Sequence, residues 1–266
     1  MTSASVSLLV RILACNLGYL LRRRESVGGY APAIPGALIG DESLERRSTA
    51  RFLDLAASER PDVISLVEVD RGSVRTATDG QVDRLCEALS ERGIEYEGAG
   101  YNKYGDDRLV GRLPIYRNLA NGVLHREDCT VVPRYLSSGL KRLVLDVRVG
   151  ASLRLFVVHL SLGSRCRANQ LAELADLVES VDEPAIVAGD FNVFDGVSEL
   201  SPLTDRAGLS LYAPGETVDE RPLDDLVVSN RHLDLFCCSP ELAVERCAVL
   251  DGGFSDHRPV VLDVEA

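Results

Sequence analysis

The chain has 266 residues, of which 45% are hydrophobic and 26% are charged, a composition typical of a globular protein rather than a disordered or fibrous one. Its net charge is −12 at pH 7, so its surface repels long nucleic acids unless arginines cluster locally or a divalent cation mediates the contact. No apolar run approaches the roughly 20 residues that cross a bilayer, and Arg11 interrupts the apolar stretch at the start. We therefore expect no transmembrane segment, no signal peptide and a cytoplasmic location.

Cysteine usage agrees with a reducing compartment. Seven cysteines occur at irregular spacing, and no CxxC pattern is present. We expect most of them to be buried small hydrophobic residues, and neither a zinc site nor a redox site.

The first half of the chain alternates strands with helices. The hydrophobic patterns predict a buried strand over 6–16, a loop over 22–43, a helix over 43–60, a strand over 61–70 and a helix over 80–92 that stops at Gly93.

The second half repeats this alternation. It predicts paired strands over 141–150 and 151–160, a helix over 166–181, a strand over 183–192, and further strands over 222–230 and 257–266. This order favours an α/β protein with two sheets packed together and helices outside. No linker or internal repeat divides the chain, so we expect residues 1–266 to form a single domain.

Polar residues recur where apolar strands end. The stretches are CN at 15–16, VEVD at 67–70, VVHL at 157–160, GDFN at 189–192, SDHRP at 255–259 and, ahead of a strand, LDDLVVS at 223–229. Each has an ordinary structural interpretation: Glu68 as a solvated strand end, His159 as a half-buried histidine with satisfied hydrogen bonds, and GDFN as a tight turn.

Together and in this order, the six stretches resemble the endonuclease/exonuclease/phosphatase superfamily, which includes deoxyribonucleases, AP endonucleases, neutral sphingomyelinases, inositol-polyphosphate 5-phosphatases and deadenylases. The resemblance runs from about residue 8 to the end, and GDFN and SDHRP lie about 65 residues apart. It implies a four-layer α/β sandwich with two central packed β-sheets flanked by helices.

The resemblance also implies a metal-dependent hydrolase of phosphoesters. This chemistry requires charge neutralisation at the phosphoryl oxygens and an activated water, and hard oxygen ligands suit Mg²⁺ or Mn²⁺. By resemblance, Glu68 is the principal metal ligand, with Asn16 and Asp256 beside it. Asp190 orients or deprotonates the attacking water, and Asn192 holds either Asp190 or the phosphate.

Two histidines complete the implied site. Asp224 is placed behind His257 and fixes its ring, although Asp225 could take that place, and His257 is either a general base or a cationic phosphate clamp. His159 donates to the phosphate or the leaving oxygen. Its presence favours the deoxyribonuclease, sphingomyelinase and inositol-phosphatase branch over AP endonucleases.

The substrate-contacting residues are less specific. Asn102 and Lys103 in YNKYGDD (101–107) match a phosphate-contacting segment, with a plain solvated loop as the alternative. Val67 stands where the family often has Gln before the metal-binding Glu.

The leading prediction is a Mg²⁺- or Mn²⁺-dependent phosphodiesterase acting on DNA or RNA. The alternatives are a lipid or small-molecule phosphodiesterase or phosphatase, and a non-catalytic binding module. No protein partner can be inferred.

Overall fold

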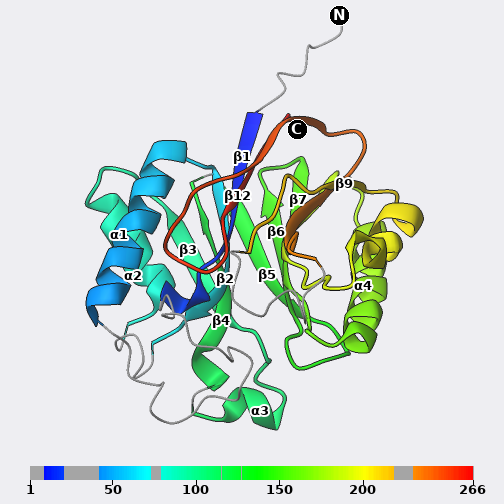
Figure 1. The fold of residues 1–266 in the computed structure, drawn as a ribbon, viewed down its shortest axis with the longest axis horizontal. Coiled ribbons are helices and arrows are strands. Elements are labelled where there is room, and N and C mark those ends of the chain that lie inside the picture. Colours follow the sequence, from blue (N-terminus) through cyan, green and yellow to red (C-terminus); the bar gives the residue numbers. More distant parts are fainter. Residues whose placement is uncertain are drawn as a thin grey trace, which may run out of the picture.

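The computed structural model describes residues 9–20, 42–72, 79–114, 116–126, 128–218 and 230–265, and these form two six-stranded sheets that pack face to face (Figure 1). The first sheet has the order β11-β12-β1-β2-β4-β3, in which only β1 and β2 pair in parallel. Its strands are β1 (Leu9–Asn16), β2 (Val63–Asp70), β3 (Glu97–Asn102), β4 (Leu119–His125), β11 (Ala243–Val249) and β12 (Val260–Glu265).

The second sheet has the order β5-β6-β7-β8-β10-β9, in which only β7 and β8 pair in parallel. Its strands are β5 (Cys129–Tyr135), β6 (Leu143–Val149), β7 (Leu153–His159), β8 (Ala185–Asp190), β9 (Ser210–Tyr212) and β10 (Asp234–Cys238).

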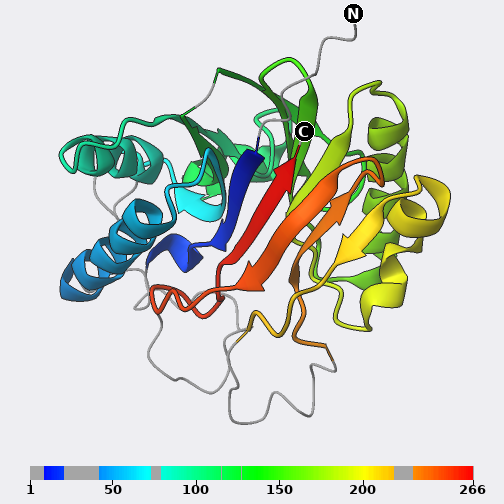
Figure 2. The same ribbon diagram turned by 90° about the horizontal axis from the view of Figure 1, so that it is seen from above.

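Helices cover the outer face of each sheet (Figure 2). The helices α1 (Glu42–Glu59) and α2 (Gln81–Ser90) pack on the first sheet, and α4 (Ser164–Glu179) packs on the second with the short turns η4 (Val197–Leu200) and η5 (Pro202–Arg206). The remaining short elements are η1 (Gly18–Leu20), α3 (Leu109–Arg112) and η3 (Tyr116–Asn118). The four layers confirm the fold class predicted from the sequence.

The alternation of side chains along each strand explains the layers. On β7, Leu153, Leu155 and Val157 face the core between the sheets, whereas Phe156 and Val158 face α4. Both faces are apolar because a helix covers the outer one, as expected for sheets buried on both sides.

The predicted helices agree with α1, α2 and α4 to within a few residues at each end. All but the last residue of the strand predicted over 222–230 lies outside the described residues, as do the start of the strand predicted over 6–16 and most of the loop predicted over 22–43. Strands β3, β4, β5, β9, β10 and β11 were not predicted; β3 and β4, for example, carry the glycine-containing runs EGAGYN and LANGVLH, and glycine weakens a strand pattern. In the described part of the chain, no helix is long and apolar enough to cross a membrane.

Candidate active site

The apolar columns that fill the space between the sheets end in polar residues at one edge. Ala14, Val123, Val157, Ala188 and Phe236 belong to the inter-sheet core, and the residue two positions away on the same strand faces the same side. Those polar neighbours are Asn16 (β1), Asn121 (β4), His159 (β7), Asp190 (β8) and Asp234 (β10), each at most 4% exposed. Since β4 and β10 run antiparallel to β2 and β8, all five lie at the same edge of their sheets.

Asp190 joins the two sheets at this edge. Its Oδ2 accepts a hydrogen bond from Asn16 Nδ2 at 3.1 Å, and its Oδ1 accepts one from the backbone N–H of Asn192 at 3.1 Å. Burial raises the pKa of Asp190 to about 6, opposed by the nearby positive charge of His257. The carboxylate is therefore fixed in orientation and is a stronger base than an exposed aspartate.

The GDFN turn requires its glycine. Gly189 has a φ of +134°, and a Cβ there would lie 2.1 Å from the backbone oxygen of Val158 on β7, so only glycine fits. Asn192 also has a left-handed φ of +52°, and its Nδ2 donates to the backbone oxygen of Leu160 at 2.9 Å. The turn thus ties the end of β8 to the end of β7.

His257 pairs with Asp234. Its Nδ1 lies 2.7 Å from Asp234 Oδ2. Burial alone would lower the pKa of His257, but the charge and hydrogen bond of Asp234, with smaller contributions from Asp190 and Glu68, raise it to about 9. The ring is therefore held in one orientation, and its protonated form is favoured.

The histidine partner predicted from the sequence needs correction. Asp224 and Asp225 lie outside the described residues, and the place assigned to Asp224 behind His257 is filled by Asp234. The signal that could have identified Asp234 is the run HLDLFCC, an acidic residue directly before a fully buried apolar stretch.

Glu68 lies on a bulge of β2. The pairing of β2 with β4 shifts between Leu66 and Val69, and Glu68 has a φ of +57°. Its Oε1 lies 3.8 Å from Lys103 Nζ and 4.0 Å from His159 Nε2. The bulge therefore places a carboxylate from the first sheet against a histidine of the second.

Asn16, Glu68 and Asp256 supply oxygen donors suited to a divalent cation. Asn16 Oδ1 accepts a hydrogen bond from the Gly18 N–H at 3.1 Å, and a Cβ on Gly18 would lie 3.4 Å from Asp256 Oδ1, so Asn16 and Asp256 flank the same turn. Glu68 follows Val67, which pairs with Asn16. Among the described residues, no group of three or more His, Cys, Asp or Glu side chains is arranged to hold a metal. Hard oxygen donors of this kind would hold a divalent cation together with water molecules.

His159 is buried between the two sheets and contacts a lysine. Its Nε2 lies 2.5 Å from Lys141 Nζ and 3.5 Å from Asp190 Oδ2. Burial, together with the charges of Lys141 and Lys103, holds the pKa of His159 well below its usual value, so the ring is neutral. Lys141 lies in none of the six stretches that resemble the family, and sequence reasoning missed it.

Of the two predicted substrate-contacting residues, the structure brings only Lys103 to the site. Its ammonium is buried, donates to the Tyr19 hydroxyl at 2.6 Å and lies near Glu68. The Asn102 amide instead organises its own loop, since it accepts from the Tyr104 N–H and donates to Asp106 and to the Gly111 oxygen.

Asn121 is a further polar residue at this edge that the sequence did not reveal. Both amide atoms are buried and have no hydrogen-bond partner within the part of the chain that the structure describes. The pairing of β4 with β2 places Asn121 beside the bulge of β2, and this pairing could not be predicted from the sequence.

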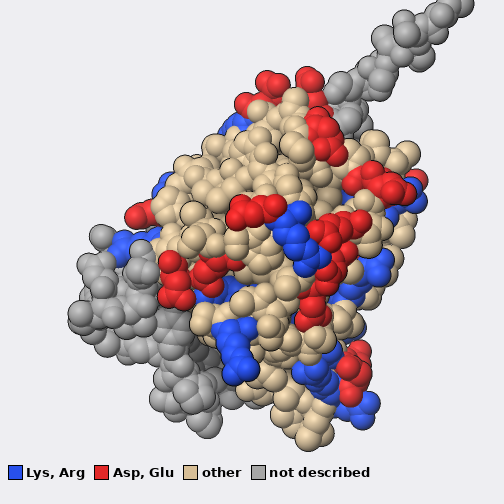
Figure 3. Space-filling view, turned by 90° about the vertical axis from the view of Figure 1, so that its right-hand side faces the viewer, with Lys and Arg blue, Asp and Glu red and all other residues tan. Residues whose placement is uncertain are grey.

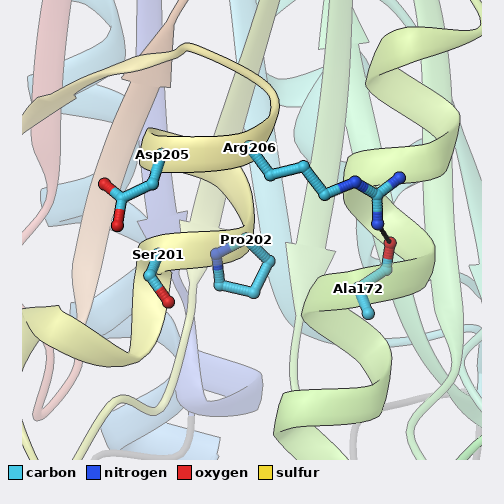
Figure 4. Close-up of a pocket in the computed structure, with 5 residues that line it drawn as sticks. All are labelled: Ala172, Ser201, Pro202, Asp205 and Arg206. Atoms are coloured by element: carbon cyan, nitrogen blue, oxygen red, sulfur yellow. Dashed lines mark hydrogen bonds between the residues drawn. The ribbon is translucent and has the colours of Figure 1, made fainter.

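A surface pocket lies elsewhere, between α4 and η5 (Figure 4). The pocket is lined by Ala172, Ser201, Pro202, Asp205 and Arg206, and the Arg206 guanidinium is already paired with Asp176 and Glu179. On the face of the molecule shown in Figure 3, acidic and basic side chains are intermixed. None of the polar residues gathered at the edge of the two sheets lines this pocket, so the pocket is separate from the candidate active site.

Comparison with known proteins gives a family match and structural neighbours. Residues 39–257 match the model of the Endonuclease/Exonuclease/phosphatase family, and no curated protein matches the chain. The fold is similar to that of an endonuclease/exonuclease/phosphatase family protein from Leptotrichia buccalis, with a TM-score of 0.68, 16% identity, and coverage of 97% of this chain and 100% of that one.

Two further neighbours are eukaryotic. The human Nocturnin catalytic domain with bound sulfate anion gives a TM-score of 0.60 and 18% identity, covering 98% of this chain and 97% of that one. TDP2 from D. rerio complexed with a single strand DNA product gives a TM-score of 0.59 and 17% identity, covering 97% and 99%. At these identities the likeness shows the fold alone.

Proposed function

The chain belongs to the endonuclease/exonuclease/phosphatase family, and from this membership we propose that it hydrolyses phosphodiester bonds with the aid of Mg²⁺ or Mn²⁺. The observation that carries the proposal is the cross-sheet hydrogen bond from Asn16 to Asp190, 3.1 Å long. It brings Asn16, on the first sheet, against the buried carboxylate of Asp190 on the second, and Glu68 lies in the same way near His159. His257, on the segment before β12 of the first sheet, reaches across to Asp234 on the second.

Each residue has a role that its environment supports. Asp190 orients the attacking water and accepts its proton, since both carboxylate oxygens are fixed by hydrogen bonds and burial raises its pKa. Asn192 holds Asp190 through its backbone N–H. Asn16, Glu68 and Asp256 hold the cation, which when bound neutralises charge on the phosphoryl oxygens.

His257 acts as a cationic clamp on the phosphate. The hydrogen bond from Nδ1 to Asp234 leaves Nε2 as the free donor of the ring. A donor fixed in this way stabilises the charge that develops on the phosphoryl oxygens without reorganising during the reaction. Lys103 adds a second positive charge beside Glu68.

We assign a nuclease-type substrate, DNA or RNA, as the leading candidate. The D. rerio TDP2 neighbour is described with a single strand DNA product. The net charge of −12 favours the second candidate, a lipid head group or a phosphorylated small molecule, because an acidic surface repels a long polyanion.

We also propose a cytoplasmic location. All seven cysteines are free thiols, as expected in a reducing compartment.

The first prediction concerns hydrolysis of bis-p-nitrophenyl phosphate. We expect turnover that requires Mg²⁺ or Mn²⁺ and stops with EDTA. Asp190→Ala and His257→Ala should each lower kcat by on the order of a hundredfold or more, because each removes a group that acts on the reacting atoms. Steady-state rates and thermal melting of each variant provide the measurement.

Asp205→Ala and His125→Ala are matched controls, since both residues lie away from the site. Unchanged rates in Asp190→Ala or His257→Ala would contradict the assignments. A wild-type protein that neither binds Mg²⁺ or Mn²⁺ in calorimetry nor hydrolyses any phosphoester would instead be a non-catalytic binding module.

A substrate panel separates the two candidate classes. Plasmid DNA, single-stranded DNA and RNA are compared with sphingomyelin and inositol phosphates at low and high salt. Nuclease activity that rises with salt identifies a polyanion held back by surface charge, whereas activity confined to head groups identifies the second candidate.

A further inference from the structure

The two lysines of this chain are both at the candidate site. The sequence has 29 basic residues, of which only Lys103 and Lys141 are lysines and the rest are arginines. Lys103 Nζ lies 3.8 Å from Glu68, and Lys141 Nζ lies 2.5 Å from His159. Lysine carries a compact point charge, whereas arginine carries a planar fork of donors. A chain that uses arginine almost everywhere thus places a compact ammonium on each side of the Glu68–His159 contact.

The segment that carries Lys141 is held firmly in place. Gln170 on α4 donates to the backbone oxygens of Lys141 and Ser138 at 2.5 and 3.0 Å. Arg108 donates to the backbone oxygen of Gly139 at 3.1 Å. The backbone on which Lys141 sits is therefore positioned from two directions.

The contact between Lys141 and His159 defines which atom donates. An ammonium has three donors and no acceptor, so His159 Nε2 must be the acceptor at 2.5 Å. The ring proton then lies on Nδ1, which is buried. With its lone pair engaged by Lys141, Nε2 has no proton to give to a phosphate.

Within the part of the chain that the structure describes, Lys141 forms no ion pair, although its charge is near enough to lower the pKa of Asp190 against the effect of burial. No carboxylate lies within 4.0 Å of its ammonium among the described residues, whereas Lys103 has Glu68 at 3.8 Å. Lys141 is only partly exposed, and a half-buried ammonium without an anion is unfavourable. Two N–H donors remain after the bond to His159, so the group is ready to bind an anion.

On the basis of the function proposed above, we propose that Lys141 binds a non-bridging oxygen of the phosphoryl group under attack, and that His159 is a positioning residue that accepts a hydrogen bond from its ammonium. This differs from the role expected from the family resemblance, in which His159 itself donates to the phosphate or leaving oxygen.

The test measures hydrolysis of bis-p-nitrophenyl phosphate and competitive inhibition by inorganic phosphate. Lys141→Met should lower kcat/KM by on the order of a hundredfold, as loss of one charged phosphate donor does, and should raise the Ki of phosphate at least about tenfold. Lys141→Arg should recover part of both losses, because it restores charge but not the compact shape. Arg47→Met, at an exposed position on α1, is the control for removal of one positive charge.

A double-mutant cycle tests the positioning role of His159. If His159 acts through Lys141, His159→Leu and Lys141→Met together should lose no more than the larger single loss. His159→Gln, whose amide oxygen can accept from the ammonium, should stay within about tenfold of wild type. Losses that simply multiply in the double variant would mean that His159 meets the phosphate independently and would overturn this part.

Phosphate binding by Lys141 can be measured independently of phosphodiester hydrolysis. Calorimetry with inorganic phosphate and Mg²⁺ on the wild type and Lys141→Met needs no turnover, and thermal melting confirms that each variant is folded. Weaker binding in Lys141→Met supports the inference even if no diester is hydrolysed. Equal binding by the two proteins, or none by the wild type, overturns it, whatever the hydrolysis assay shows.

Discussion

The orientation of His257 depends on a single carboxylate. The side chains of His257 and Asp234 are 13% and 2% exposed, and their hydrogen bond is 2.7 Å long. Since little water competes at such a site, the bond both selects the ring tautomer and favours the imidazolium. Loss of the Asp234 charge should therefore remove both the fixed tautomer and the protonated state of His257, while the ring itself stays in place.

A residue-scale prediction follows for Asp234→Asn, which keeps the shape of the side chain but removes its charge. We expect kcat for bis-p-nitrophenyl phosphate to fall by at least on the order of a hundredfold, because an amide neither stabilises the imidazolium nor enforces its tautomer. Steady-state kinetics and a folding control provide the measurement. Asp224→Asn is the comparison: a large loss there, with little loss in Asp234→Asn, would return the partner role to Asp224.

The site was only partly predictable from single residues. The residues near the end of an apolar run are Asn16, Glu68, His159 and Asp190, and Asp256 and His257 stand just before one, so a local pattern points to all six. Asp234 was missed because the neighbouring stretch LDDLVVS offered a similar pattern. Lys141 could not be found in this way: its contact with His159 spans 18 residues and depends on how an irregular segment meets β7.

At the scale of elements, the site depends on the backbone conformation at the ends of β2 and β8. The bulge of β2 turns Glu68 out of the strand alternation, and the turn after β8 brings the Asn192 N–H to Asp190. Both Glu68 and Asn192 have left-handed backbone conformations, which are unfavourable for residues other than glycine, though asparagine tolerates them best. Apolar runs in the sequence located β1, β2, β7 and β8, but the bulge in β2 could not be predicted, because it depends on the pairing with β4.

The turn after β8 gives an element-scale prediction. Asn192→Ala loses the hydrogen bond to the Leu160 oxygen and forces alanine into a left-handed φ, whereas Asn192→Gly loses only the hydrogen bond. We expect the glycine variant to be the more stable of the two by up to about 1 kcal/mol, because left-handed strain of about 1–2 kcal/mol outweighs the extra chain entropy of glycine. The free energy of unfolding from urea titration measures the difference. A more stable alanine variant would mean that the turn relaxes out of the left-handed region.

At the scale of the whole molecule, the two sheets are packed in three separate apolar layers. One layer lies between the sheets and draws on both, and the other two lie under the helices. Cys238 lies in the central layer, Cys15 in the layer under α1 and α2, and Cys237 in the layer under α4. Each layer therefore contains its own buried thiol.

The reactivity of these thiols can show whether the two sheets unfold together. Burial raises the pKa of Cys237 to about 12 and holds the pKa values of Cys15 and Cys238 well above their usual value, so at pH 8 none forms the reactive thiolate in the native state. In brief N-ethylmaleimide pulses along a urea gradient, read by mass spectrometry, exposed Cys166 should react without denaturant. Cys15, Cys237 and Cys238 should become reactive at one common midpoint, which coincides with the loss of circular dichroism, because the central layer cannot open without exposing both sheets. Labelling of Cys15 at a lower urea concentration than Cys237 would show that the first sheet opens alone, and the chain would then be two folding units rather than the single domain that its sequence predicts.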